Sequence, residues 1–258
     1  MYSIPTLAIS GIIFICIIFF YLTGVWVSRL QKKNNPDAKA EGVGPFEGAL
    51  LGLLALLLSF TFNMSASRYD TRRALLIQES IYISTVLSCA DLYPDSSRRE
   101  FRKDLQQYIE ARILYYNAGT IDEVKIARTL HDAAKISNRI WQRAAHLSKE
   151  SSAAVPYNLM LSALNDMTGV VTNRDAARLA RVPEPIIWLL FILTFLGSLI
   201  IGYSKKEKKN DWVVLSIYSL MTVITIYIII DLDRPQRGII KTDTAHHKIV
   251  TLRNLFKE

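Results

Sequence analysis

A row of small and polar side chains runs through the apolar residues 46–64 and beyond them. Its members recur three or four residues apart, which places them on one face of an α-helix: Gly48, Gly52, Ala55, Ser59, Phe62, Asn63, Ala66 and Asp70. Donor groups at Ser59, Thr61 and Asn63 could coordinate a partly dehydrated ion. The alternative is close packing of a second helix on the glycines, with hydrogen bonds across the contact. For the first use, Ser59, Phe62, Asn63 and Ala66 are the candidate pore-lining residues.

Charged side chains gather where the apolar segments end. Asp231 and Asp233 follow one such segment, and carboxylates at a helix C-terminus oppose the helix dipole at a cost of ~0.3–1 kcal/mol each when unpaired. We therefore expect arginine partners nearby. Ion pairs at this level would lock the segments together, whereas surplus arginine would attract anions to a pore mouth. The candidates for either role are Arg68, Asp70, Arg72, Arg73, Arg178, Arg181, Asp231, Asp233 and Arg234.

No residue pattern indicates an enzyme, a metal site or a cofactor. The sequence has no glycine-rich phosphate loop and no serine nucleophile elbow, and residues 131–135 (HDAAK) lack the glutamate and second histidine of a zinc-protease helix. We expect the adjacent His246 and His247 to lie in a solvated tail. The net charge of +8 is better explained by lipid phosphates beside the membrane than by nucleic acid.

Four apolar segments must position these residues: 4–28, 46–66, 185–203 and 212–231. Each is long enough to cross a ~30 Å hydrocarbon layer as a helix. The first has no basic start and no small-residue cleavage site, so we expect a retained span rather than a signal peptide. No ionisable group lies deep in any segment, which disfavours a proton-driven transporter. The sequence predicts an all-α integral membrane protein with four transmembrane helices.

The polar residues 67–183, between the second and third segments, are predicted to form an extramembrane helical bundle. The helix of the second span has no breaker and should continue to about residue 90, a length of ~65 Å. Pro94 ends it, and Ser97 with Glu100 has the spacing of a capping box for the next helix. Two more helices follow, beginning near Thr120 and Pro156. Residues 232–258 are predicted to be a polar, partly disordered tail.

The two short loops, 29–45 and 204–211, predict the orientation in the membrane. Both are basic and both lie on the same side of a four-span protein. Positive charge in short loops marks the cytoplasmic side. We therefore expect a bacterial inner membrane protein whose termini and helical bundle lie outside the cytoplasm.

The order of these parts resembles the bacterial bestrophin-like family of membrane proteins. The resemblance covers about residues 5 to 240 and is carried by GALLGLLALLLSFTFNMSASRYDTRRALLIQES, by ADLYPDSSRREFRKDLQQYIEARILYY and LNDMTGVVTNRDAARLARVPEPIIWLL, and by the ending DLDRPQRG. It implies distant kinship to bestrophins, which are pentameric anion channels. It thus implies a homo-oligomer, such as a pentamer, embedded in membrane lipid and passing small anions, with the second span nearest the axis.

Two features depart from bestrophins. Bestrophins keep their helical domain in the cytoplasm, which is opposite to the orientation expected from the loop charges. The sequence also has no acidic cluster suited to a calcium clasp. Two functions therefore compete. One is a passive anion channel, and the other is a non-conducting envelope scaffold or sensor whose outer bundle binds a partner.

Overall fold

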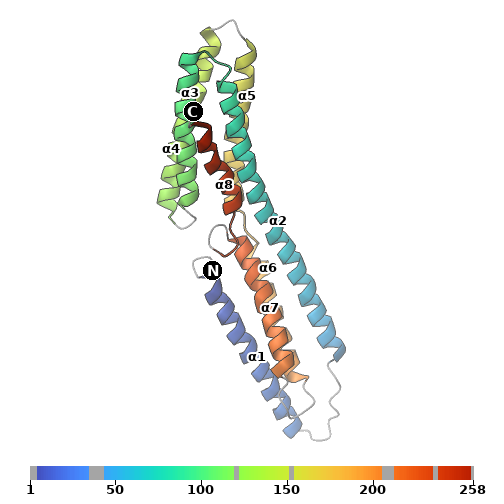
Figure 1. Cartoon of the computed structure of the whole chain (residues 1–258). Coiled ribbons are helices and arrows are strands. Elements are labelled where there is room, and N and C mark those ends of the chain that lie inside the picture. Colours follow the sequence, from blue (N-terminus) through green and yellow to red (C-terminus); the bar gives the residue numbers. More distant parts are fainter. Residues whose placement is uncertain are drawn as a thin grey trace. The chain divides into compact units, whose positions relative to one another are not determined.

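A computed structural model describes residues 5–34, 44–118, 122–150, 154–204, 212–234 and 238–256. These residues form eight α-helices and one 3-10 helix, and the described part of the chain contains no strand. The helices are α1 (Thr6–Asn34), α2 (Gly44–Ala90), α3 (Asp95–Asn117), α4 (Glu123–Glu150), α5 (Ala154–Leu179), α6 (Glu184–Tyr203), α7 (Trp212–Asp233), α8 (Asp243–Thr251) and η1 (Leu252–Phe256) (Figure 1).

The predicted fold class is confirmed. Four helical stretches are long and apolar enough to cross a membrane: Thr6–Lys33, the start of Gly44–Ala90, the end of Tyr157–Tyr203 and Trp212–Asp233. The chain divides into two compact units. One holds residues Met1–Arg68 and Arg181–Arg234, and the other holds Tyr69–Ala180 and Pro235–Glu258. Helix α2 is continuous over 47 residues and contributes its two halves to the two units.

The first unit is built on the packing of α1 against α6 and α7. Ile17, Tyr21, Leu190 and Ile226 are among the buried residues of its apolar core. Helices α1 and α6 approach so closely that a Cβ atom on Gly24 would collide with the backbone of Leu199, and one on Gly202 with the backbone of Tyr21. Ser198 Oγ adds a hydrogen bond of 2.5 Å to the carbonyl oxygen of Ile17 on α1.

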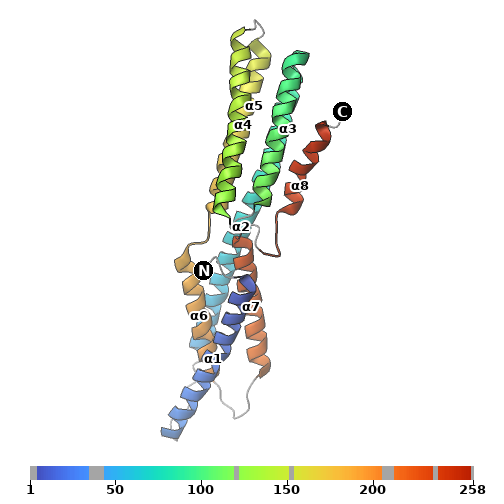
Figure 2. The same cartoon turned by 90° about the vertical axis from the view of Figure 1, so that its left-hand side faces the viewer.

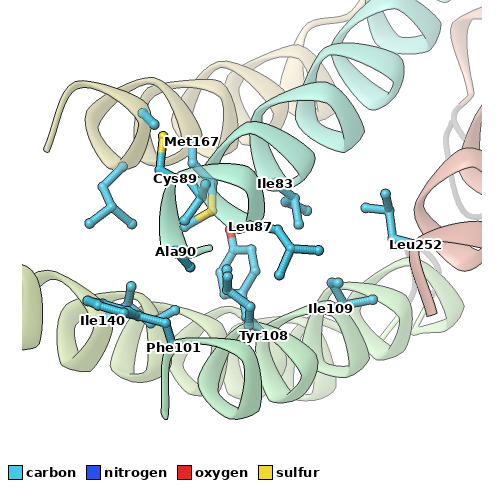
Figure 3. Packing of buried hydrophobic residues seen from close by; sticks show 14 of the residues in the cluster. Ile83, Leu87, Cys89, Ala90, Phe101, Tyr108, Ile109, Ile140, Met167 and Leu252 are labelled. Atoms are coloured by element: carbon cyan, nitrogen blue, oxygen red, sulfur yellow. The ribbon is translucent and has the colours of Figure 1, made fainter. Parts of the chain in front are cut away.

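The second unit is a bundle of α3, α4 and α5 with the polar half of α2 (Figure 2). Its core is one cluster of buried side chains from all four helices, and Figure 3 shows part of it. Ile83 and Leu87 of α2, Phe101 and Tyr108 of α3, Ile140 of α4 and Met167 of α5 meet there. The three- and four-residue spacing of apolar positions thus explains why each helix presents one buried face.

Two expectations about the second unit were wrong. Helix α3 begins at Asp95, directly after Pro94, and no side-chain hydrogen bond caps it. The capping box of Ser97 with Glu100 is therefore not formed. Residues 232–258 are not simply a tail, because they contain α8 and η1, whose buried Ile249 and Leu252 join the core of the bundle.

Candidate functional site: an uncovered face of helix α2

The apolar half of α2 leaves its small and polar face uncovered. Ser59 and Asn63 are exposed, Phe62 is 41% exposed, and Ala66 is half-buried. Neither Ser59 nor Asn63 makes a side-chain hydrogen bond to another described residue. No heavy atom lies within 4 Å of a Cβ built on Gly48 or Gly52. Within the described chain, the glycines therefore do not serve the close helix packing that was the alternative use of this pattern.

The opposite face of α2 is the one that packs against the first unit. Leu54, Thr61 and Ser65 are buried, and Leu57 and Leu58 pack against the unit's core. Thr61 Oγ1 donates to the carbonyl oxygen of Leu57 in its own helix at 2.7 Å. The expectation that Thr61 offers a donor beside Ser59 and Asn63 was therefore wrong. Thr61 is two residues from Ser59 and two from Asn63, so its side chain lies on the opposite side of the helix from theirs.

The charged candidate residues near the end of this half of α2 differ in their exposure to solvent. Asp70 and Arg73 are exposed, whereas Arg72 is buried. Arg68 is half-buried, and its Nη1 atom has no hydrogen-bond partner among the described residues. Before α6, Arg181 is exposed, and Arg178 pairs with Asp175 one turn earlier in α5 at 3.0 Å.

The acidic end of α7 is buried. Asp231, Asp233 and Arg234 are all at most 3% exposed. The carboxylate of Asp233 accepts hydrogen bonds of 3.0 and 3.2 Å from the backbone N–H of Val182, just before α6. Arg234 Nη1 donates to Thr6 Oγ1 at the start of α1 at 3.4 Å. A carboxylate near the start of α6 is favourable for the dipole of that helix, which offsets the unfavourable position at the end of α7.

The second unit contains a buried cluster of charged side chains that was not predicted from the sequence. Glu79 of α2, which is fully buried, accepts a hydrogen bond of 2.5 Å from Arg112 Nε of α3, and it also pairs with Arg174 of α5. The ring of Tyr115 lies beneath both guanidinium groups, at 4.6 and 5.3 Å. Burial alone would raise the pKa of Glu79, but Arg174 and Arg112 outweigh it and lower the pKa to about 2. The carboxylate is therefore ionised and joins three helices.

The signal for this cluster was present in the sequence. Glu79 recurs with Leu76, Ile83 and Val86 at helical spacing, so a carboxylate lies on the face of α2 that enters the core. Arg112 likewise shares the apolar face of α3 with Tyr108 and Ile109. A charge on a buried face needs a partner of opposite sign. Only the structure identifies Arg174 as the second partner, because α5 lies far away in the sequence.

Helix α8 is fixed to α3 by aromatic and polar contacts. The ring of His246 stacks on Tyr116 with 3.7 Å between centroids, and Tyr116 Oη donates to Asp243 at 2.9 Å. Arg253 pairs with Glu110 at 2.5 Å. His246 is thus buried, and the expectation of a solvated histidine pair was wrong for it, although His247 is exposed. Among the described residues, no group of His, Cys, Asp or Glu side chains could hold a metal ion.

Comparisons with known proteins agree with this architecture. A family model described as a Bestrophin-like domain matches residues 11–246. A crystal structure of a bacterial bestrophin homologue from Klebsiella pneumoniae is similar to the chain with a TM-score of 0.68 and 16% identity, over 92% of this chain and 98% of that one. A point mutant of such a homologue from the same organism gives a TM-score of 0.70 at 14% identity, over 94% and 98%. No curated protein matches the chain.

Proposed function

The chain belongs to the Bestrophin-like family, and on this premise we propose that it forms an oligomeric membrane channel for small anions. Several copies surround an axis, and α2 lies nearest to it. A pentamer is the state that kinship to bestrophins implies. The observation that carries the proposal is the uncovered face of α2, where Ser59 and Asn63 make no side-chain hydrogen bond to another described residue.

Three properties of this face suit a water-filled path better than contact with lipid. Ser59 and Asn63 offer hydrogen bonds that the hydrocarbon layer could not satisfy. Gly48 and Gly52 leave room beside the helix. Phe62 and Ala66 would complete the lining, with Phe62 as its apolar constriction. The exposed Arg73 would supply positive charge beyond the spanning half and thereby favour anions. Arg68 is nine residues from Ser59 and therefore lies on the opposite side of the helix, where its Nη1 atom is buried.

The orientation of the channel remains part of the proposal. The basic short loops 29–45 and 204–211 favour the cytoplasmic side, which leaves both termini and the bundle outside. Reporter domains fused to the C-terminus test this. An enzyme that is active only outside the cytoplasm should be active in the fusion, and one that is active only inside should be silent. The reverse pattern would put the bundle in the cytoplasm.

Halide flux from liposomes tests conduction. Liposomes that contain the purified full-length protein should release chloride and iodide faster than empty liposomes and faster than liposomes with heat-inactivated protein. Ser59→Trp should block the release, because an indole would fill the proposed path. The matched control is Ile15→Trp on an exposed face of α1, which should leave the flux unchanged. Equal flux in both variants would contradict the assignment of the α2 face to the pore.

Arg73→Gln should lower the preference for anions over cations. Arg128→Gln, which removes an exposed arginine of α4 in the bundle, is the control for net charge. Absence of flux in the unaltered protein across pH, calcium and voltage would instead favour the second candidate function, a non-conducting scaffold or sensor. One observation supports that alternative: α2 runs without interruption from its apolar half to the buried Glu79 cluster.

A further inference from the structure

The bundle of the second unit contains a cavity that the proposed channel function does not use. It has a volume of about 450 Å³ and lies between α4 and α5, with Tyr108 of α3 as a further wall residue. This volume is in the range of sites that hold small organic molecules. All of its lining residues belong to the second unit. The cavity is open to solvent, because Asn138, Trp141 and Asn165 in its lining are exposed.

The lining of the cavity is partly polar and carries no charged side chain. Ser137 and Asn138 of α4 and Asn165 of α5 contribute a hydroxyl group and two amides. None of these three groups makes a hydrogen bond to another described residue. Each carboxamide can both donate and accept. The cavity therefore presents two amides and a hydroxyl group that are available to a ligand.

Two aromatic rings complete the recognition surface. Trp141 is 39% exposed, although it lies on the same helix as the buried Ile140, and its indole lines the cavity. Tyr108 is only 2% exposed, yet its hydroxyl group has no hydrogen-bond partner among the described residues. Burial raises the pKa of Tyr108, so the phenol is a neutral donor. The phenol can therefore donate a hydrogen bond to a ligand in the cavity.

These groups define the chemistry of the ligand. The lining has no charged side chain that could pair with an ion, which favours an uncharged ligand over an anion or a cation. Aromatic rings offer a flat apolar surface, while amides and hydroxyl groups bond to matching polar groups. We propose that this cavity is a binding site for an uncharged, ring-containing molecule that bears amide or hydroxyl groups, distinct from the ions that the channel would pass.

Three probes that share the tyrosine ring but differ in charge test whether the cavity prefers an uncharged ligand. N-acetyl-tyrosinamide is neutral, N-acetyl-tyrosine is an anion, and tyrosinamide is a cation below neutral pH. Saturation-transfer NMR on the full-length protein in lipid nanodiscs should show binding of the neutral probe at millimolar concentration and much weaker signals for the two ions. Equal signals for all three probes, or none for the neutral one, would overturn the proposal.

Substitutions locate the binding. Asn165→Leu and Asn138→Leu should each weaken binding of N-acetyl-tyrosinamide by about fivefold, as expected for a lost hydrogen bond. Ser137→Phe should abolish it by filling the cavity. The matched control is Asn173→Leu, which removes an exposed amide of the same helix α5 outside the cavity. Binding that persists in Ser137→Phe, or that falls equally in Asn173→Leu, would place the probe elsewhere and contradict the proposal.

A labelling experiment asks whether a second copy of the chain covers the cavity. Asn138→Cys is introduced into a chain whose Cys16 and Cys89 are replaced by alanine. A maleimide should label it in the intact protein, and N-acetyl-tyrosinamide should slow the labelling. Labelling only after denaturation would mean that a neighbouring copy closes the cavity, and the proposal would fail. These readouts do not depend on ion flux, so failure of the channel proposal would leave them interpretable.

Discussion

Glu79 and Arg112, which are 33 positions apart in the sequence, share a hydrogen bond of 2.5 Å between two fully buried side chains. With Arg174, they form a cluster of one carboxylate and two guanidinium groups inside an otherwise apolar core. Replacing such a group by apolar residues of the same shape can be neutral, whereas removing one partner leaves a buried charge uncompensated. The cluster therefore makes the packing of α2, α3 and α5 sensitive to single substitutions.

Glu79→Gln should lower the free energy of unfolding by about 3–5 kcal/mol, because both arginines would stay buried without their carboxylate. Chemical unfolding of the purified protein in mild detergent measures this. The control is Asp91→Asn, which breaks the partly exposed ion pair with Arg102 and should cost less than ~1 kcal/mol. Equal effects of the two substitutions would show that the buried cluster is not specially important to stability.

The stack of His246 on Tyr116 should weaken in acid. Burial, and then Arg174, lower the pKa of His246 from 6.5 to about 4, against the opposing effect of Asp243. The folded protein thus holds the neutral ring, so this stabilisation is complete above pH 6.5 and is lost as the pH falls toward about 4.

Thermal unfolding as a function of pH measures this loss. The melting temperature of the unaltered protein should fall relative to that of His246→Phe across this window, since phenylalanine keeps a ring but cannot be protonated. His247→Phe, at an exposed position, should follow the unaltered protein. Parallel curves for the unaltered protein and His246→Phe would contradict the prediction.

Gly202→Ala should disrupt the contact of α1 with α6, because the added methyl group would meet the backbone of Tyr21. Alanine is otherwise favoured over glycine in helices by roughly 0.5–1 kcal/mol. Gly11→Ala makes the same change where no heavy atom lies within 4 Å, so it is the matched control. Size-exclusion chromatography and the melting temperature in detergent should show loss of folded protein only for Gly202→Ala. If the protein stays folded with either substitution, α1 and α6 must be further apart at Gly202 than in this structure, which would contradict the prediction.

Asp233→Ala should destabilise the first unit by about 1–3 kcal/mol, because the buried N–H of Val182 would lose its acceptor. Asp233→Asn keeps a carbonyl oxygen that can accept the same hydrogen bond, so it should retain most of the stability. The comparison also tests the predicted ion pair of Asp233 with an arginine. If the negative charge itself is essential, asparagine should be as harmful as alanine.

Local pattern was enough to predict the helical class and the polar stripe on α2, because both follow from residue spacing within one segment. Long-range partners could not be predicted in the same way. Nothing near Asp233 in the sequence points to the N–H of Val182, and nothing near Gly24 reveals that Leu199 lies against it. The tail was misread because α8 is short and mostly polar, and its stability comes from Ile249 and His246 packing on a bundle formed by distant residues.

Because α2 is one continuous helix, the direction in which its uncovered face points is related to that of Glu79 by the number of residues between them. Asn63 and Glu79 are sixteen residues apart on one helix, which corresponds to a rise of about 24 Å and a rotation of about 160°. This rotation follows from helical geometry alone, because α2 is one continuous helix. Inserting one residue between them would turn the Asn63 side by about 100°, whereas inserting seven, nearly two full turns, would return it almost to its original bearing. The number of residues between Asn63 and Glu79, and not only their identity, therefore determines the angle between these two side chains about the helix axis.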